Sequence, residues 1–144
     1  MKKNKSQVSM EFMLVLAIAL TLLAALLPVY GKAQEKTSDA LLGEAQQAAF
    51  SRMVSLARQA EILGQGNSLS SKISFQAENT AITFGKSAGI LKMEYYAATG
   101  KKQINETLGF PVELGSENFP KGRYIMETRW NKQVMISLHE QNQE

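Results

Sequence analysis

The chain has 144 residues, 44% of them hydrophobic and none of them cysteine, which allows one long helix and one small domain and excludes disulfides and thiolate metal sites. It carries 16 basic and 13 acidic residues, a formal net charge of +3. Three of the basic residues, Lys2, Lys3 and Lys5, lie within residues 1–6, so 13 residues of each sign remain from Gln7 onward. A neutral body has no basic face for nucleic acid, and we expect no nucleic-acid partner.

An uncharged, mostly apolar stretch runs from Phe12 to Gly31. About twenty residues of helix rise about 30 Å, the thickness of the hydrocarbon core of a bilayer. The basic residues ahead of the stretch favour a cytoplasmic N-terminus and an outside location for the rest of the chain. One acid, Glu11, stands at the start of the stretch. A carboxylate at this position contributes nothing to a secretory signal. Glu11 is therefore either solvated at the headgroup level or paired with another group in a functional contact.

The residues ahead of the apolar stretch form the motif Gln7-Val-Ser9-Met-Glu11-Phe12, preceded by Lys5-Ser6. This motif resembles the class III signal peptide of archaeal type IV pilin-like proteins. The resemblance implies that a prepilin-type membrane aspartic peptidase cuts between Ser6 and Gln7 and leaves the apolar helix on the mature protein. It further implies a set of residues recognised by the peptidase: Lys5, Gln7, Ser9, Glu11 and Phe12.

The same resemblance implies a function. The chain would be a major or minor subunit of an archaeal surface filament, built from identical or related pilin subunits by an ATP-driven assembly platform. It would lie in the cytoplasmic membrane before assembly and in an extracellular filament afterwards. Adhesion and other filament roles stay open, although a swimming filament would usually have longer subunits, which favours a pilus.

Small residues recur along one side of the apolar stretch at steps of three and four, a spacing that lets helices approach closely. Pro28 lacks an amide hydrogen, and we expect a kink or local loosening of the helix there. In the filament, Glu11 would pair with the N-terminal amine of a neighbouring subunit, unless an N-terminal Gln7 cyclises and removes that amine. The residues expected to act in assembly are Glu11, Ala17, Thr21, Ala24 and Pro28.

Helical periodicity continues beyond Gly31 in more polar sequence, and residues 64–67 contain two glycines that signal the end of the helix. Ser38 or Asp39 would cap a second helical segment if residues 31–36 were not helical. We expect the apolar stripe of this segment to pack on a sheet, with a coiled coil as the alternative. The stripe consists of Leu42, Ala45, Ala49, Met53, Leu56, Ala60 and Leu63.

From Leu69 onward the apolar residues alternate with polar ones, which is typical of strands with one buried face. Turns are expected at 78–80, at 99–101 and around Asn131, and residues 101–109 are expected as a loop or an edge. The polar tail from His139 to the end is expected to fray. The segments expected as strands are 72–78, 81–84, 89–96, 110–114, 123–130 and 132–138, with 110–114 as a short edge strand because of its proline.

The expected fold class is therefore α+β, with a long N-terminal helix packed on a small antiparallel sheet. Four segments follow from this: a cleaved basic leader at 1–6, an apolar transmembrane or filament-core helix at 7–31, an amphipathic helix at 32–64, and an antiparallel β domain at 65–144.

Constellations for catalysis and metal binding are missing from the sequence. A single histidine, His139, without cysteine does not make a zinc site, and no catalytic triad or phosphate-loop motif is present. We therefore expect no catalytic residues, no metal, no cofactor and no enzyme activity. Asn105 opens an Asn-Glu-Thr sequon in an expected outside loop and is a candidate for glycosylation. Trp130 and the tyrosines at 95, 96 and 124 are expected to pack on the sheet, with contact to a sugar or a neighbouring subunit as the alternative.

Two other functions compete with the filament subunit. One is a membrane-anchored extracellular binding module that does not polymerise, and the other is a tethered enzyme, which the missing constellations disfavour. The residue at which the mature protein begins distinguishes these functions. A start at Gln7 supports the pilin, a start at Ala33 or later indicates a released or trimmed protein, and an intact Met1 favours a simple anchor.

Overall fold

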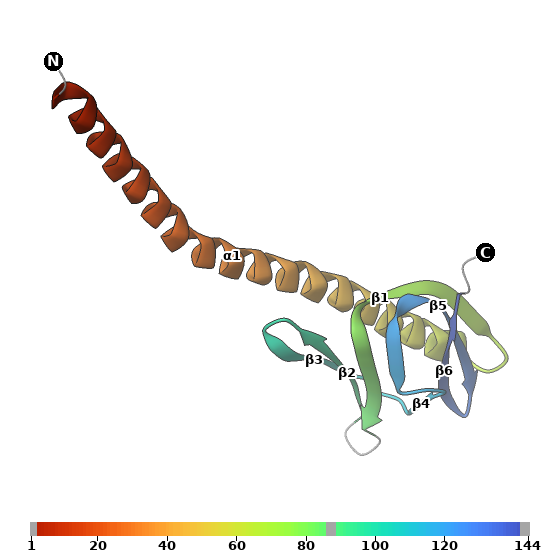
Figure 1. Ribbon diagram of the computed structural model, residues 1–144. Coiled ribbons are helices and arrows are strands. Elements are labelled where there is room, and N and C mark those ends of the chain that lie inside the picture. Colours follow the sequence, from red (N-terminus) through yellow and green to blue (C-terminus); the bar gives the residue numbers. More distant parts are fainter. Residues whose placement is uncertain (1–2, 86–88, 142–144) are drawn as a thin grey trace. The chain divides into compact units, whose positions relative to one another are not determined.

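The computed structural model describes residues 3–85 and 89–141, with side chains from Ser9 onward (Figure 1). The described chain contains one helix followed by six strands, so the predicted α+β class is confirmed. The elements in order are α1 (Lys3–Leu63), β1 (Ser68–Gly85), β2 (Ile90–Ala97), β3 (Gly100–Thr107), β4 (Val112–Leu114), β5 (Asn118–Asn131) and β6 (Gln133–Glu140).

The chain divides into two compact units, an N-terminal unit up to Ser38 and a C-terminal unit from Asp39 on. The N-terminal unit is the first part of α1, and the C-terminal unit combines the second part of α1 with the sheet. The helix continues without interruption through Pro28 and Gly31, so neither Ser38 nor Asp39 caps a second helix.

The predicted end of the helix near residue 64 is confirmed. Gly64 follows the last helical residue with a φ of 75°, a left-handed conformation that glycine adopts without steric cost. Its amide donates to the carbonyl of Ala60 at 3.2 Å. The side-chain amide of Asn67 then donates to the carbonyl of Leu63 at 2.8 Å, which satisfies one of the free acceptors at the helix terminus.

The strands form one sheet in the order β3-β2-β1-β5-β6-β4. Neighbours are antiparallel except for β4, which runs parallel to β6, so the expectation of a wholly antiparallel sheet is wrong at this edge. The chain reverses between β4 and β5 and again between β5 and β6, and these two reversals leave β4 and β6 pointing in the same direction. Pro111 stands directly before β4, in keeping with the predicted short edge strand.

The predicted turn at 78–80 is wrong, because β1 runs through these residues as a single strand. Its pairing with β5 shifts register between Phe75 and Asn79, which is a β-bulge. Buried positions accordingly change phase, from Ala77 on one side of the bulge to Thr80 and Ile82 on the other. The two successive exposed residues, Glu78 and Asn79, therefore mark a bend within β1 and not a turn between two strands.

The predicted hairpin around Asn131 and the predicted turn near residues 99–101 are confirmed, with small shifts. β2 and β3 pair up to Ala97 and Gly100, so the turn falls on Ala98 and Thr99, and β3 is an edge strand, one of the two alternatives expected for residues 101–109. β5 and β6 meet around Lys132, which has a φ of 65°. β6 extends to Glu140, so the first part of the tail pairs with β5, while residues 142–144 lie outside the described residues.

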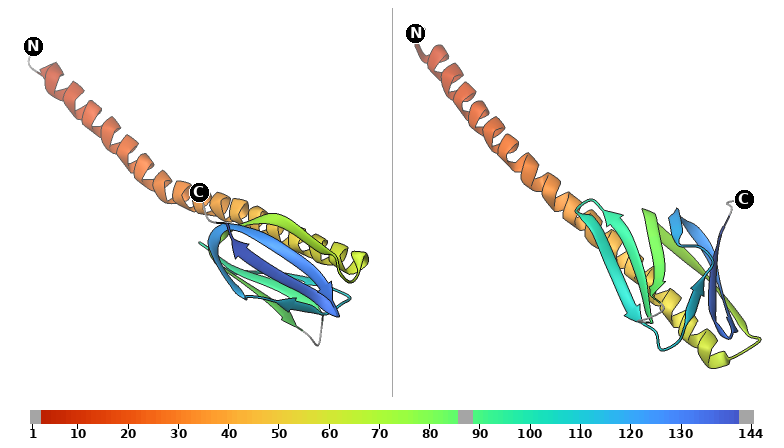
Figure 2. Two further views of the ribbon diagram at one scale, coloured as in Figure 1. Left: turned by 90° about the vertical axis from the view of Figure 1, so that its right-hand side faces the viewer. Right: turned by 90° about the horizontal axis from the view of Figure 1, so that it is seen from below.

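One face of the sheet packs against the part of α1 that follows Asp39 (Figure 2). Phe75, Phe119 and Tyr124 form an aromatic cluster in this core, with ring centroids 5.5 to 5.7 Å apart. The predicted stripe is confirmed in its centre and wrong at its end, where Leu63 is 51% exposed. The buried helix residues are Gln46, Ala49, Phe50, Met53, Val54, Ala57 and Ala60.

Candidate functional site

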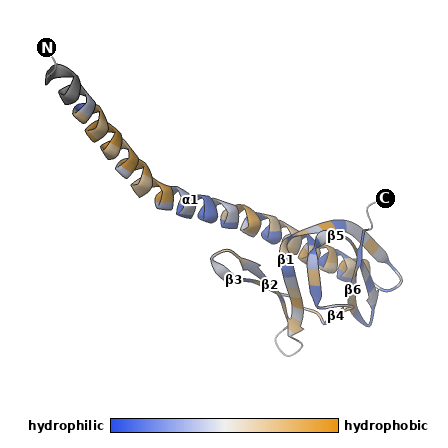
Figure 3. Cartoon of the chain, in the orientation of Figure 1, coloured by the Kyte–Doolittle hydropathy of each residue, from blue (hydrophilic) through white to orange (hydrophobic). Residues whose placement is uncertain are grey.

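The N-terminal unit presents an apolar surface along its described residues. Every side chain from Ser9 to Ser38 is exposed, including all the large aliphatic residues of the apolar stretch. Figure 3 shows this stretch as the most continuous hydrophobic part of α1. By length and composition α1 could cross a membrane, so the N-terminal unit is compatible with a membrane anchor.

The residues predicted to act in assembly lie along this exposed helix. Ala17, Thr21, Ala24 and Pro28 follow one another at steps of four, three and four residues, which places them on one side. The hydroxyl of Thr21 donates to the carbonyl of Ala17 at 2.8 Å, so this polar group is satisfied within the helix and needs no partner in an apolar environment. Pro28 has no amide to donate, and the carbonyl of Ala24 loses its usual donor.

The motif resembling a pilin signal lies in the first turns of α1. Ser9, Glu11 and Phe12 are exposed, and Glu11 immediately precedes the apolar stretch, as expected. The backbone of residues 5–7 is helical, and the side chains of Lys5, Ser6 and Gln7 lie outside the described residues.

In the C-terminal unit, a buried glutamine of α1 faces the bulge of β1. The register shift leaves Gln76 and Ala77 without partners on β5, so their amides need other acceptors. When the side-chain amide of Gln46 is oriented with its oxygen toward the bulge, Oε1 accepts from Ala77 N at 2.7 Å and from Gln76 N at 3.3 Å. The Thr80 hydroxyl lies 3.5 Å from the same amide group. Gln46, which is fully buried, therefore holds the bulge in place.

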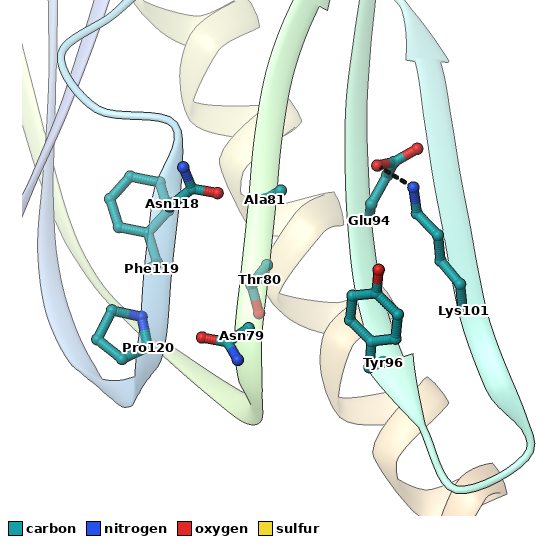
Figure 4. A pocket seen from close by; sticks show the side chains of 9 residues that line it. All are labelled: Asn79, Thr80, Ala81, Glu94, Tyr96, Lys101, Asn118, Phe119 and Pro120. Carbon is teal, nitrogen blue, oxygen red and sulfur yellow. Dashed lines mark ion pairs between the residues drawn. The ribbon is translucent and has the colours of Figure 1, made fainter.

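A cavity of about 330 Å³ opens beside the bulge, on the face of the sheet away from the helix (Figure 4). Figure 4 shows Tyr96 and Glu94 on β2, with Lys101 next to them on β3. The amides of Asn79 and Asn118 come from β1 and β5. The remaining lining residues are Thr80, Ala81, Phe119 and Pro120.

Tyr96 does not pack on the sheet as predicted. Its side chain is 63% exposed, and among the described residues from Asp39 on it is the one exposed aromatic side chain. Alternation along β2 explains the difference, because Tyr95 takes the position facing the core and its neighbour must face outward. Tyr95 and Tyr124 are buried as predicted. Trp130 is half-buried and contacts Phe110 edge-to-face at 6.4 Å.

The charges at the cavity are paired. The Glu94 carboxylate lies 2.6 Å from the Lys101 ammonium and 2.5 Å from that of Lys92. Hydrogen bonds from Lys101 first, and then from Lys92, lower the pKa of Glu94, and the bond to Glu94 raises the pKa of Lys101. Glu94 is therefore ionised at neutral pH and is paired with two ammonium groups.

The sequon lies in a strand and not in the expected loop. Asn105 belongs to β3 and pairs with Lys92, and it is exposed. Alternation puts it on the outward face together with Tyr96, opposite to Ile104. Residues 101–107 are mostly polar because β3 is an edge strand that contributes little to the core.

Asp39 contacts the turn between β2 and β3, a contact that sequence reasoning missed. Its Oδ1 accepts from Ala98 N and its Oδ2 from Thr99 N, both at 2.9 Å. Hydrogen bonding from the side chain of Thr99 is the largest cause that lowers the pKa of Asp39, and the two amides add to it. The local sequence offered no signal, because the partners are 59 and 60 residues away.

Among residues 3–85 and 89–141, no group of three or more histidine and acidic side chains is placed to hold a metal ion. His139 lies exposed on β6. The chain matches no family model, no curated protein and no solved structure.

Proposed function

We propose that the chain is a structural subunit, major or minor, of an archaeal type IV pilus-like surface filament. The observation that carries this proposal is the motif from Gln7 to Phe12, directly ahead of an apolar helix whose side chains are all exposed. In this proposal a prepilin-type peptidase cuts before Gln7, and an ATP-driven platform assembles the mature subunits through that helix.

The exposed helix supports the proposal on energetic grounds. Burying one large aliphatic side chain is worth about 1.5–3 kcal/mol, so a helix that is apolar on every side needs cover along its whole length. Lipid would supply that cover before assembly, and helices of other subunits would supply it in the filament. The small residues Ala17, Thr21 and Ala24 would let those helices approach closely.

Glu11 fits a filament better than a simple anchor. A carboxylate among packed apolar helices costs several kcal/mol of desolvation unless a cation pairs with it. Cleavage before Gln7 would create an amine that a neighbouring Glu11 can meet, and this pair would set the axial register of the subunits. If Gln7 cyclises, Glu11 needs another donor or a proton.

A second candidate is a membrane-anchored extracellular module that binds a ligand and does not polymerise. The cavity beside Tyr96 favours it, because a binding surface on the sheet has a use without a filament. This candidate requires the helix to span the membrane but gives no role to Glu11. The two functions therefore differ in what they require at the N-terminus.

The first experiment is mass spectrometry of the mature protein from cells that contain the peptidase. A start at Gln7, or at its cyclised form, supports the filament subunit. An intact Met1 favours the anchored module, and a start at Ala33 or later would overturn both. Electron microscopy of sheared surface fibres then tests whether the processed chain polymerises.

The second experiment replaces the acid. Glu11→Ala is expected to be processed and inserted but to yield at least about tenfold fewer fibres, because the lost pairing is worth several kcal/mol. The matched control is Glu35→Ala, which removes an exposed acid from the polar part of the same helix and should leave fibre yield unchanged. Normal fibre yield from Glu11→Ala would contradict the proposed pairing of Glu11 with a neighbouring amine.

A further inference from the structure

We propose that the cavity beside Tyr96 is a carbohydrate site that takes one neutral sugar unit. The site is formed by the outward faces of β1, β2, β3 and β5 and lies beside the bulge of β1. This inference goes beyond the proposed filament and does not depend on it, because either a subunit or an anchored module can carry a ligand site.

The exposed aromatic ring is the first argument. Phenol rings usually gain stability when their apolar faces are covered, and every other Phe, Tyr or Trp side chain among the described residues of the C-terminal unit is buried or half-buried. Tyr96 instead leaves 63% of its surface to solvent at a cavity wall. The apolar C–H face of a pyranose ring is a flat partner of matching size for such a ring.

The polar groups around the ring are the second argument. Each hydroxyl of a sugar both donates and accepts hydrogen bonds, so its site needs donors and acceptors side by side. Asn79 and Asn118 are exposed amides that each offer both. Glu94 is an ionised acceptor, and among the lining residues its charge is matched by that of Lys101, which suits a neutral ligand better than an ion.

The third argument is that the site is largely preformed. The bulge takes Asn79 out of the regular alternation of β1, and Gln46 fixes the bulge from the helix side. A volume of about 330 Å³ lies at the small end of ligand sites, which run from about 300 to 1,000 Å³. It therefore fits a single sugar ring better than an extended ligand.

Sugar units could reach the cavity from two sources. One is a polysaccharide on another cell or surface, and the other is a glycan attached to Asn105 of this chain or of a second copy. Asn105 lies on the same face of the sheet as Tyr96. Both sources present the same chemistry, and the Asn105→Gln variant separates them.

The test is saturation-transfer NMR on the full chain in micelles of a detergent without a sugar headgroup. The probes are the methyl glycosides of glucose, galactose, mannose and N-acetylglucosamine. At least one probe should receive saturation, and Tyr96→Ala should weaken its binding about tenfold or more. Tyr96→Phe keeps the ring, and Met135→Ala removes an exposed apolar side chain elsewhere, so both should stay within about twofold of the unaltered protein.

Two results would overturn the proposal. One is that no probe shows saturation that depends on Tyr96. The other is that Tyr96→Ala folds normally and abolishes fibres while no probe binds, which would assign the surface to contact between subunits. Stronger probe binding by Asn105→Gln than by the glycosylated protein would identify the chain's own glycan as the occupant. The binding experiment uses protein dispersed in micelles, so a failure to bind sugar is distinct from a failure to form filaments.

Discussion

The two parts of α1 differ in how they are covered. From Ser9 to Ser38 every side chain is exposed, whereas the part from Asp39 to Leu63 buries one face against the sheet. Isolated helices gain little stability in water, and most of their stability in proteins comes from packing. The second part of α1 packs against the sheet of its own unit, whereas the first part has no packing partner within its unit.

The arrangement of apolar residues also differs between the two parts. The C-terminal part packs small alanines such as Ala57 and Ala60, at most 1% exposed, which let the helix backbone lie close to the sheet. The N-terminal part is apolar on every side, with small residues along one side and large aliphatic residues on the others, a pattern typical of a helix that is surrounded. The two parts of one continuous helix thus carry different apolar patterns.

The largest difference between the two units is expected when one large side chain is removed from each. Phe75→Ala takes a fully buried ring from the aromatic cluster and should lower the free energy of unfolding of the C-terminal unit by about 3–5 kcal/mol. Leu22→Ala takes an exposed residue from the N-terminal unit and should leave that free energy unchanged. Urea unfolding followed by the fluorescence of Trp130, the single tryptophan, measures both. Equal losses in the two variants would show that the units unfold together.

A smaller effect is expected where helix and sheet share a polar contact. Gln46→Leu keeps a buried side chain of similar length but leaves two amides of the bulge without their acceptor. A buried donor without a partner costs about 1–3 kcal/mol, and the same urea experiment should register a loss in that range. Gln47→Leu alters the exposed neighbour and should stay within about 0.5 kcal/mol of the original. A negligible loss for Gln46→Leu would mean that water reaches the bulge.

Much of the fold could be predicted from local sequence, because periodicity and turn residues act over short distances. The helix, its end at Gly64, the turn after β2 and the hairpin of β5 and β6 follow from such signals. The bulge was missed because polar residues at 78 and 79 also suit a turn. A local signal did exist, since apolar positions change from odd to even numbers between Ala77 and Ile82.

The candidate site was harder to predict than the fold. The expectation that Tyr96 packs on the sheet is wrong although a local signal exists, since the apolar Leu91 and Met93 alternate with polar residues and place Tyr95, not Tyr96, toward the core. Gln46 was missed because a glutamine on a helix usually lies in solvent, and its partners belong to a bulge that was itself missed. These contacts join residues far apart in the chain, and only the register of the sheet brings them together.

The smallest expected effect concerns Asp39, the first residue of the C-terminal unit, which holds the turn at Ala98 and Thr99. Its folded pKa lies below the ordinary value of 3.8. The stabilisation is therefore fully present above the unfolded pKa and is lost as the pH falls through the lower, folded value. The amide proton shifts of Ala98 and Thr99, followed by NMR from about pH 6 to about pH 2, should report this transition.

Two variants decide whether Asp39 is the group responsible. Asp39→Asn keeps one acceptor oxygen but no charge, so both amides should shift upfield at neutral pH and lose their transition in acid. Glu44→Gln neutralises an exposed acid on the same helix and should leave the transition intact. If the amides of Ala98 and Thr99 titrate alike in Asp39→Asn and in the unaltered protein, another carboxyl group controls the turn. In that case the charge of Asp39 would not fix the turn, and the first residue of the C-terminal unit would resemble the exposed helix residues before it.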